Sequence, residues 1–217
     1  MIPQDIAGTI DHTLLKPNAT RDQIEKLCQE ARQYHFASVC VNSCWVPLCR
    51  ELLDGSDVMV CTVIGFPLGS ASTHAKSEES RKAIEEGADE LDMVINVGKL
   101  LDGDFDYVHD DIAAVVKAAD GKVVKVIIEI CYLDERLIIE ACRISQEACA
   151  SFVKTSTGFG TGGATVEAVR LMRQTVGYSM GVKASGGIKD RSDALAMLEA
   201  GASRIGASAG IAIVEGR

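Results

Sequence analysis

The chain has 217 residues, of which 47% are hydrophobic and 24% charged, and its formal net charge is −9. This length and the even spread of apolar residues are typical of a globular protein with a sizeable core and argue against extensive disorder. The acidic balance argues against a broad nucleic-acid-binding surface, which needs basic residues. No apolar run is long enough to span a membrane, and Met1–Asp5 shows no secretory signal. We therefore expect a cytoplasmic protein.

Eight segments rich in β-forming residues alternate with amphipathic segments along the chain. The predicted strands are Thr9–His12, Ser38–Val41, Met59–Ile64, Glu90–Asn96, Val123–Ile130, Phe152–Lys154, Gly181–Ala184 and Arg204–Gly206. The predicted helices are Arg21–Tyr34, Trp45–Leu53, Thr73–Glu86, Phe105–Ala119, Asp134–Ala148, Val166–Val176 and Asp190–Ala200. Two of them follow capping residues, Thr20 and Thr165. This alternation predicts an α/β fold, a closed (β/α)8 TIM barrel that forms a single domain over residues 1–217 with a short N-terminal helical lead-in.

The eight cysteines and four histidines show no pattern of a metal site. No Cys-x-x-Cys pair occurs, and Cys40, Cys44 and Cys49 have no histidine nearby at zinc-ligand spacing. Most cysteines stand among apolar neighbours, so we expect reduced thiols that pack as small hydrophobic groups. The sequence therefore predicts no metal and no cofactor.

Two lysines stand near the carboxyl ends of neighbouring predicted strands, where barrel enzymes carry their active sites. They are Lys154 in Phe152–Lys154 and Lys183 in Gly181–Ala184, and the alternation of side chains points both into the barrel. A buried lysine is costly unless it is paired or neutral. One such lysine could form a structural ion pair, but two at matching positions favour catalysis.

Acidic and basic residues on two further strands share this interior. Alternation within Glu90–Asn96 points Asp92 inward, because the opposite face is fully apolar. The same argument places Lys125 and Glu129 on the inward face of Val123–Ile130. The residues expected to meet inside the barrel are Asp92, Lys125, Glu129, Lys154 and Lys183.

This set of residues favours one kind of chemistry. At pH 7 only about one free lysine in 2,500 carries a neutral amine. Burial and a second ammonium nearby both favour the neutral form. A neutral lysine can form a Schiff base with a carbonyl, and a neighbouring carboxylate can move the protons that this reaction requires. The interior therefore predicts a metal-independent class I aldolase.

Glycine-rich segments follow the last three predicted strands. Ser185–Gly187 and Gly206–Ser208 stand where barrels commonly bind phosphate with backbone N–H groups. Gly158–Gly163 matches the G-x-G-x-x-G pattern, but no acidic residue ends the following strand, so a flexible loop over the barrel opening is favoured over a dinucleotide site. The residues expected to bind substrate and phosphate are Thr157, Gly158, Ser185, Gly186, Gly187, Gly206 and Ser208.

Four ordered motifs closely resemble the 2-deoxyribose-5-phosphate aldolase family. They are Ile10-Asp11-His12-Thr13-Leu14-Leu15, Leu91-Asp92-Met93-Val94-Ile95-Asn96, Val153-Lys154-Thr155-Ser156-Thr157-Gly158 and Val182-Lys183-Ala184-Ser185-Gly186-Gly187-Ile188. The resemblance implies reversible cleavage of 2-deoxy-D-ribose 5-phosphate to acetaldehyde and D-glyceraldehyde 3-phosphate, in the breakdown of deoxyribonucleotides. It implies that Lys154 forms the Schiff base, Asp92 donates and accepts protons, Lys183 tunes the nucleophile and assists proton transfer, and Lys125 supports the network.

The sequence departs from the family pattern at two places. Some relatives carry a phosphate-binding lysine at the position of Phe159, and some end in a tail whose tyrosine reaches the site, whereas this chain stops at Glu215-Gly216-Arg217. Phosphate binding and the final proton transfer are therefore the parts that the resemblance does not carry over.

Two other functions remain open on the sequence alone. One is another phosphate-binding barrel enzyme, of a transaldolase-like or isomerase type, and the other is a non-catalytic barrel that binds a sugar phosphate. Neither needs both lysines. We expect sugar phosphates and aldehydes as partners, no nucleic acid or membrane, and, by the resemblance, a homodimer or a higher homo-oligomer.

Overall fold

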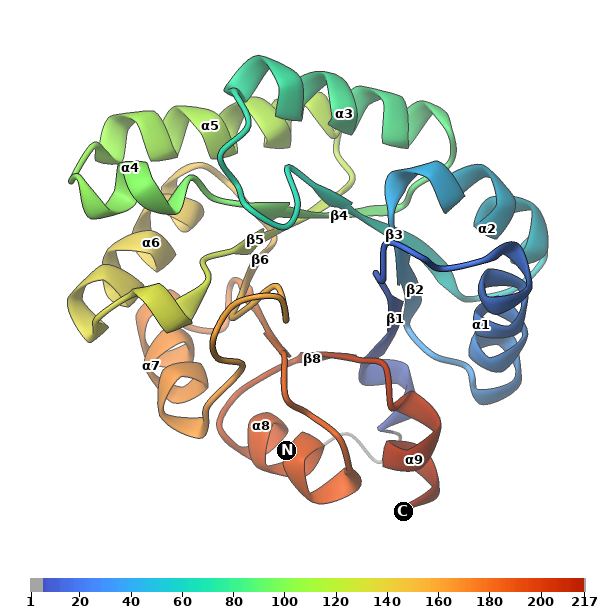
Figure 1. The fold of residues 1–217 in the computed structure, drawn as a ribbon. Coiled ribbons are helices and arrows are strands. Elements are labelled where there is room, and N and C mark those ends of the chain that lie inside the picture. Colours follow the sequence, from blue (N-terminus) through green and yellow to red (C-terminus); the bar gives the residue numbers. More distant parts are fainter. Residues whose placement is uncertain (1–5, 217) are drawn as a thin grey trace.

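The structure, a computed structural model, describes residues 6–216. Eight parallel strands close into a barrel in sequence order, and β8 pairs back onto β1. The strands are β1 (Ile10–Leu14), β2 (Ser38–Val41), β3 (Met59–Ile64), β4 (Glu90–Val94), β5 (Val123–Ile127), β6 (Phe152–Lys154), β7 (Gly181–Ser185) and β8 (Arg204–Ala207). Helices form a ring around this barrel (Figure 1), and the prediction of a (β/α)8 barrel is confirmed.

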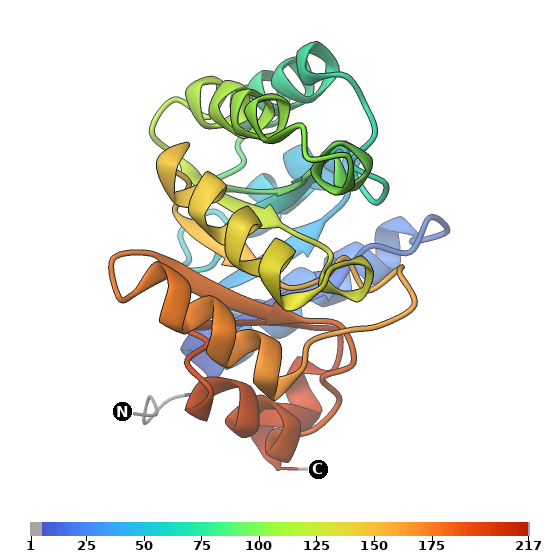
Figure 2. The same cartoon turned by 90° about the vertical axis from the view of Figure 1, so that its left-hand side faces the viewer.

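The helical ring is seen from the side in Figure 2, where α6 and α7 lie side by side. The helices are α1 (Arg21–Tyr34), α2 (Val46–Leu52), α3 (Thr73–Glu85), α4 (Val97–Leu101), α5 (Phe105–Ala118), α6 (Glu135–Glu147), α7 (Val166–Val176), α8 (Arg191–Glu199) and α9 (Gly210–Glu215). The predicted caps are present. Gln23 Oε1 accepts a hydrogen bond from Thr20 N at 3.0 Å, and Thr165 Oγ1 accepts one from Ala168 N at 3.1 Å.

The structure differs from the predicted elements mainly in the ends of strands, in two short helices and in the N-terminal lead-in, and β1 ends at Leu14 rather than at His12. Two strands end earlier than predicted, because Asn96 caps the unpredicted helix α4 and Glu129 adopts a left-handed backbone conformation with φ of 56°. The short helix α9 was not predicted either. Of the predicted N-terminal lead-in, one 3₁₀ turn is seen at Ala7–Thr9, and Met1–Asp5 lie outside the described residues.

The two faces of the barrel strands carry different residues. The outward face packs against the helices through apolar side chains that are fully buried, and these include Val39, Val60, Leu91, Met93, Val124, Val126, Val153, Val182 and Ile205. The inward face carries most of the buried charged residues, so the main hydrophobic core lies between barrel and helices. A smaller apolar cluster, Leu15, Cys40, Cys61 and Val63, is separate from it. Within residues 6–216, no helix is long and apolar enough to cross a membrane.

Candidate active site

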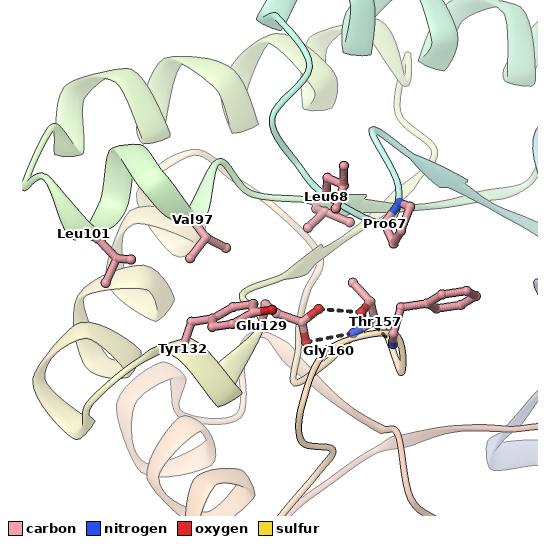
Figure 3. A pocket seen from close by; sticks show the side chains of 10 residues that line it. Pro67, Leu68, Val97, Leu101, Glu129, Tyr132, Thr157 and Gly160 are labelled. Atoms are coloured by element: carbon pink, nitrogen blue, oxygen red, sulfur yellow. Dashed lines mark hydrogen bonds between the residues drawn. The ribbon is translucent and has the colours of Figure 1, made fainter.

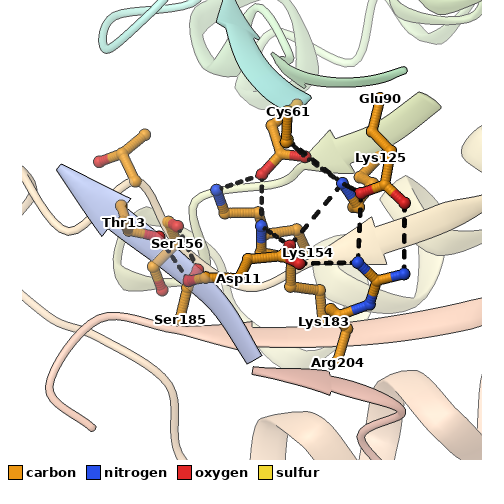
Figure 4. A network of polar contacts seen from close by, with 12 residues as sticks. Asp11, Thr13, Cys61, Glu90, Lys125, Lys154, Ser156, Lys183, Ser185 and Arg204 are labelled. Atoms are coloured by element: carbon orange, nitrogen blue, oxygen red, sulfur yellow. Dashed lines mark hydrogen bonds and ion pairs between the residues drawn. The ribbon is translucent and has the colours of Figure 1, made fainter. Parts of the chain in front are cut away.

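Three lysines meet Asp92 inside the barrel. Figure 4 labels these lysines, Lys125, Lys154 and Lys183, within the network of polar contacts. The strand register places Asp92 beside Lys125, and Lys154 beside Lys183. The ammonium groups of Lys154 and Lys183 each donate a hydrogen bond to Asp92 Oδ2 at 2.7 Å. Lys125 donates to Asp92 Oδ1 at 2.8 Å. The structure therefore brings together the four side chains that the sequence singled out as catalytic.

Of the three lysines that contact Asp92, Lys154 lies nearest to the barrel opening. Its side chain is 3% exposed and lines a cavity of about 410 Å³, whereas Lys125 and Lys183 are fully buried and do not line it. Among the described residues, Asp92 is the sole carboxylate in contact with Lys154. A small molecule that enters the cavity therefore reaches the amine of Lys154 before that of either other lysine.

Three charged residues that sequence analysis did not assign to the site complete the interior network. Asp11 on β1 accepts hydrogen bonds from Lys183 and, at 2.7 Å, from Arg204. Glu90 on β4 forms an ion pair with Lys125 at 2.6 Å and also accepts hydrogen bonds from Arg204. These residues lie deeper in the barrel than Lys154 and hold the two inner lysines in place.

Alternation along the strands could have identified these residues. Glu90 precedes Asp92 by two positions, and Arg204 precedes Gly206 by two, so each pair shares the inward face of its strand. Asp11 precedes Thr13 by two positions on β1, and its side chain also points inward. The alternation of side chains along the strands therefore carries a signal for all three residues.

Opposite charges inside the barrel shift one another's pKa values toward the charged forms. Burial by itself would raise the pKa of Asp92, but the three neighbouring lysines outweigh it and hold this pKa well below its usual value. Burial opposes the charge on Lys183, yet Asp11 and Asp92 outweigh it and raise the pKa of this lysine. The pKa of Lys125 is raised well above its usual value in the same way. Asp92 is thus a carboxylate, and the two inner lysines are cations.

Cys40, Cys61 and Asp92 have potential metal-ligand atoms within 4.8 Å of one another. Both oxygens of Asp92 already accept hydrogen bonds from lysine ammonium groups, and Lys125 Nζ lies 3.3 Å from the Cys61 sulfur. Burial, together with the hydrogen bond to Cys40 and the charge of Asp92, raises the pKa of the Cys61 thiol well above its usual value. These fixed positive charges oppose a cation here, so the residues do not fit a metal ion.

The predicted substrate-binding loops line the same cavity as Lys154. Its walls come from the ends of β1, β6, β7 and β8 and include all seven predicted residues: Thr157, Gly158, Ser185, Gly186, Gly187, Gly206 and Ser208. Gly187 has a φ of 82°, and a Cβ atom there would meet nothing within 4 Å. At Gly206 a Cβ atom would lie 3.0 Å from Lys183 Cε, so this glycine makes room for the lysine.

The prediction that Glu129 joins the lysines inside the barrel is wrong. The strand ends at Ile127, and the left-handed turn at Glu129 carries its side chain to the opening instead. There its carboxylate accepts hydrogen bonds from the backbone N–H of Thr157, at 3.1 Å, and from the Thr157 hydroxyl. Glu129 therefore fixes the start of the loop between β6 and α7.

A second cavity, of about 440 Å³, lies beside the first (Figure 3). Its lining is mainly apolar: Pro67, Leu68, Val94, Val97, Leu101, Glu129, Tyr132, Thr157, Phe159 and Gly160. Phe159 and Thr157 line both cavities, and the Phe159 ring meets that of Phe66 edge to face at 5.3 Å. Phe159 thus forms part of the wall between the two cavities.

The loop that carries the G-x-G-x-x-G pattern packs against the loop after β7. Ala164 N donates hydrogen bonds to the carbonyl oxygens of Ser185, at 3.1 Å, and Gly186, at 3.0 Å. A Cβ atom at Gly163 would lie 2.2 Å from the Gly186 oxygen, so only glycine fits there. The pattern serves close packing of two loops at the barrel opening.

Comparison with known proteins places this geometry in a family. The model of the DeoC/LacD family aldolases matches residues 6–216. The deoxyribose-phosphate aldolase of Streptococcus gordonii is 62% identical over 95% of this chain and 94% of its own length. That of Thermococcus gammatolerans is also 62% identical, over 100% of this chain and 98% of its own.

A solved structure agrees with these sequence matches. The tetrameric deoxyribose phosphate aldolase of Aeropyrum pernix superposes with a TM-score of 0.90 and 36% identity, over 97% of this chain and 89% of that one. Family model, relatives and structure all cover nearly the whole chain, including the strands that carry Asp92, Lys125, Lys154 and Lys183. The chain belongs to the DeoC/LacD family of aldolases.

Proposed function

We propose that this protein is a class I aldolase that reversibly cleaves 2-deoxy-D-ribose 5-phosphate to acetaldehyde and D-glyceraldehyde 3-phosphate, with Lys154 as the Schiff-base residue. The observation that carries this proposal is the position of Lys154, at the end of β6, in a cavity that a substrate can enter and 2.7 Å from Asp92. The relatives that share about 60% of its residues are named deoxyribose-phosphate aldolases.

The charge balance inside the barrel favours a neutral amine on one lysine. The interior network of the described residues contains four cationic side chains, Lys125, Lys154, Lys183 and Arg204, against three carboxylates, Asp11, Glu90 and Asp92. Loss of one proton balances these charges in a site where excess charge is costly. Lys154 has one carboxylate contact where Lys125 and Lys183 have two or more, and of these three lysines it is the one that lines the cavity, so we assign the nucleophile to Lys154.

The reaction follows from this arrangement. The free amine of Lys154 adds to the C1 carbonyl of the open-chain sugar, and uptake of one proton with loss of water gives a protonated Schiff base. Removal of the proton from the C3 hydroxyl breaks the C2–C3 bond, which releases glyceraldehyde 3-phosphate and leaves an enamine on Lys154. Protonation of the enamine carbon and addition of water then release acetaldehyde and restore the amine.

Asp92 is placed to move these protons, and Lys183 is placed to hold Asp92 through a hydrogen bond. When Lys154 is neutral, one of the three lysine charges that lower the pKa of Asp92 is gone, and this carboxylate accepts a proton more readily. Lys183 keeps its charge because its pKa is raised, so it serves as a hydrogen-bond donor to Asp92 and opposes a second ammonium at Lys154. Lys125 holds the other oxygen of Asp92.

Borohydride trapping tests the nucleophile directly. Incubation with acetaldehyde and borohydride should add an ethyl group to Lys154, which peptide mass spectrometry can locate. Lys154→Ala and Lys154→Arg should each lose about 10⁴-fold or more in turnover, because alanine lacks the amine and a guanidinium stays protonated. A label on another residue would exclude the assignment.

Treatment with EDTA should leave the activity unchanged, and a loss that zinc restores would indicate a metal-dependent aldolase instead.

The assembly and location of the protein are part of the same proposal. We expect a homo-oligomer, a dimer or larger, supported by the tetrameric relative from Aeropyrum pernix. We expect it to act in the cytoplasm on sugar phosphates released from deoxyribonucleotides. Light scattering on the purified protein measures its assembly, and a monomer over a wide concentration range would contradict this part.

A further inference from the structure

The cavity around Lys154 is lined by basic and not by acidic side chains, although the protein is acidic. The formal net charge of the chain is −9, yet the residues that line this cavity include two lysines and no aspartate or glutamate. One of the two is Lys154, which the proposed mechanism uses as the nucleophile. The other is Lys16, which takes no part in the proton transfers at Lys154.

The backbone around Lys16 is held at the edge of the cavity. Leu15, just after β1, is buried, and its carbonyl accepts a hydrogen bond from Asn42 Nδ2 at 3.3 Å. The carbonyl of Lys16 accepts one from Ala19 N at 3.1 Å. Pro17 further restricts the backbone of the residue before it. The chain therefore presents the Lys16 side chain from a fixed point.

Lys16 lines the same cavity as the loops expected to bind phosphate. β1 pairs with β8, and β8 pairs with β7, so the loops after these three strands are neighbours at the barrel opening. Gly187 and Ser208, from the loops after β7 and β8, are exposed and line the same cavity as Lys16. These loops offer backbone N–H groups but no cationic side chain to that cavity.

The ammonium of Lys16 is available for a ligand. Its side chain is exposed and forms no ion pair within residues 6–216. A phosphate monoester carries close to two negative charges at neutral pH, and a hydrogen bond to a charged partner is stronger than a neutral one. Phe159, which lines the same cavity, offers no charge.

We propose that Lys16 binds the phosphate dianion of the substrate and so sets the preference for phosphorylated over unphosphorylated sugars. This inference rests on the proposed aldolase function, because the phosphate belongs to the sugar that Lys154 attacks. Lys16 supplies the charge, while the backbone N–H groups near Gly187 and Ser208 supply the fixed hydrogen bonds.

Kinetics of Lys16→Met on two substrates test the proposal. The ratio of kcat/KM for 2-deoxy-D-ribose 5-phosphate to that for 2-deoxy-D-ribose should fall about tenfold or more, mainly through KM for the phosphorylated sugar. Lys16→Arg, which keeps the charge, should retain most of the ratio. Inorganic phosphate, as an inhibitor of deoxyribose cleavage, should bind Lys16→Met about tenfold more weakly than the wild type.

Lys189→Met is the matched control. Lys189 is an exposed lysine in the loop after β7, at the same end of the barrel, but it does not line the cavity. An equal fall in the ratio for this variant would show a general effect of surface charge and would overturn the proposal, as would an unchanged ratio for Lys16→Met. Phe159→Lys in the Lys16→Met background should restore part of the ratio, because position 159 lines the same cavity.

The same experiments distinguish a failure of the proposed aldolase function from a failure of the proposed role of Lys16. If the wild type traps no acetaldehyde with borohydride and cleaves neither sugar, the proposed function is wrong. If it traps acetaldehyde and cleaves both sugars, but the ratio does not depend on Lys16, only the role of Lys16 is wrong.

Discussion

Two groups of buried charges lie on either side of β4. Comparison of the two shows which arrangement of buried charges serves the reaction and which serves only the stability of the fold. Inside the barrel, Asp92 meets three lysines, and one of them reaches a cavity. Between the helices, Lys76 and Asp111 form a single pair at 2.5 Å. All of these side chains are almost completely inaccessible to solvent, so burial alone does not distinguish the two groups.

The pair between the helices is balanced and complete. Lys76 Nζ also donates a hydrogen bond to the carbonyl of Val94 at 2.8 Å, and Asp111 also accepts one from Thr73 at 2.9 Å. One positive charge therefore meets one negative charge, and each group has a further partner. The interior network instead has one cation more than its carboxylates can neutralise, and this excess lies at the opening. A balanced pair fixes helices, whereas an unbalanced network with access to substrate can change its protonation.

Replacement of Asp92 should break the interior network most severely. Asp92→Asn keeps the shape but cannot accept a proton as the carboxylate does, so turnover should fall about 10²- to 10⁴-fold. Exchange of deuterium into the methyl group of acetaldehyde should slow in parallel, while some trapping on Lys154 remains. If Asp92 were only an ion-pair partner, the variant would lose stability in urea yet exchange deuterium at nearly the wild-type rate per folded molecule.

Lys76→Met should break the balanced pair and leave the chemistry largely intact. The substitution leaves the buried carboxylate of Asp111 without its cation, which should lower the free energy of unfolding by about 3–5 kcal/mol. The double variant Lys76→Met/Asp111→Leu should recover most of this loss, as measured by urea unfolding.

The control for this prediction lies on the same helix. Lys82 on α3 forms an exposed pair with Glu86 at 3.1 Å, so Lys82→Met should cost less than about 1 kcal/mol. A similar cost for Lys76→Met and Lys82→Met would contradict the structural role of the buried pair.

Lys183→Met should shift the pH dependence of the reaction. The charge of Lys183 is one of the three that lower the pKa of Asp92, so its removal raises this pKa and a higher pH is needed to keep Asp92 a carboxylate. The acid limb of the profile of kcat/KM against pH should therefore move upward. A downward shift, or a lower rate with an unchanged profile, would show that Lys183 does not control the charge of Asp92.

Much of the site could be predicted because the barrel repeats one simple rule. Once eight strands alternate with helices, the side-chain period of two decides which residues face inward, and parallel strands bring their carboxyl ends together. That rule placed Asp92, Lys125, Lys154 and Lys183 correctly. It failed at Glu129, where a left-handed residue ends the strand and turns the side chain to the opening. The left-handed conformation of Glu129 goes with its hydrogen bond from Thr157, a residue distant in sequence, so strand periodicity could not predict it.

The sequence by itself determined the barrel, the inward lysines and the glycine-rich loops, because these depend on periodicity and on residue type. Only the tertiary structure decided how the charges are shared. It joined Asp11, Glu90 and Arg204 to the lysines, placed Lys154 alone of the three lysines on the cavity, and brought Lys16 to the same opening. These residues come from strands and loops far apart in the chain, and closure of the barrel between β8 and β1 is what makes them neighbours.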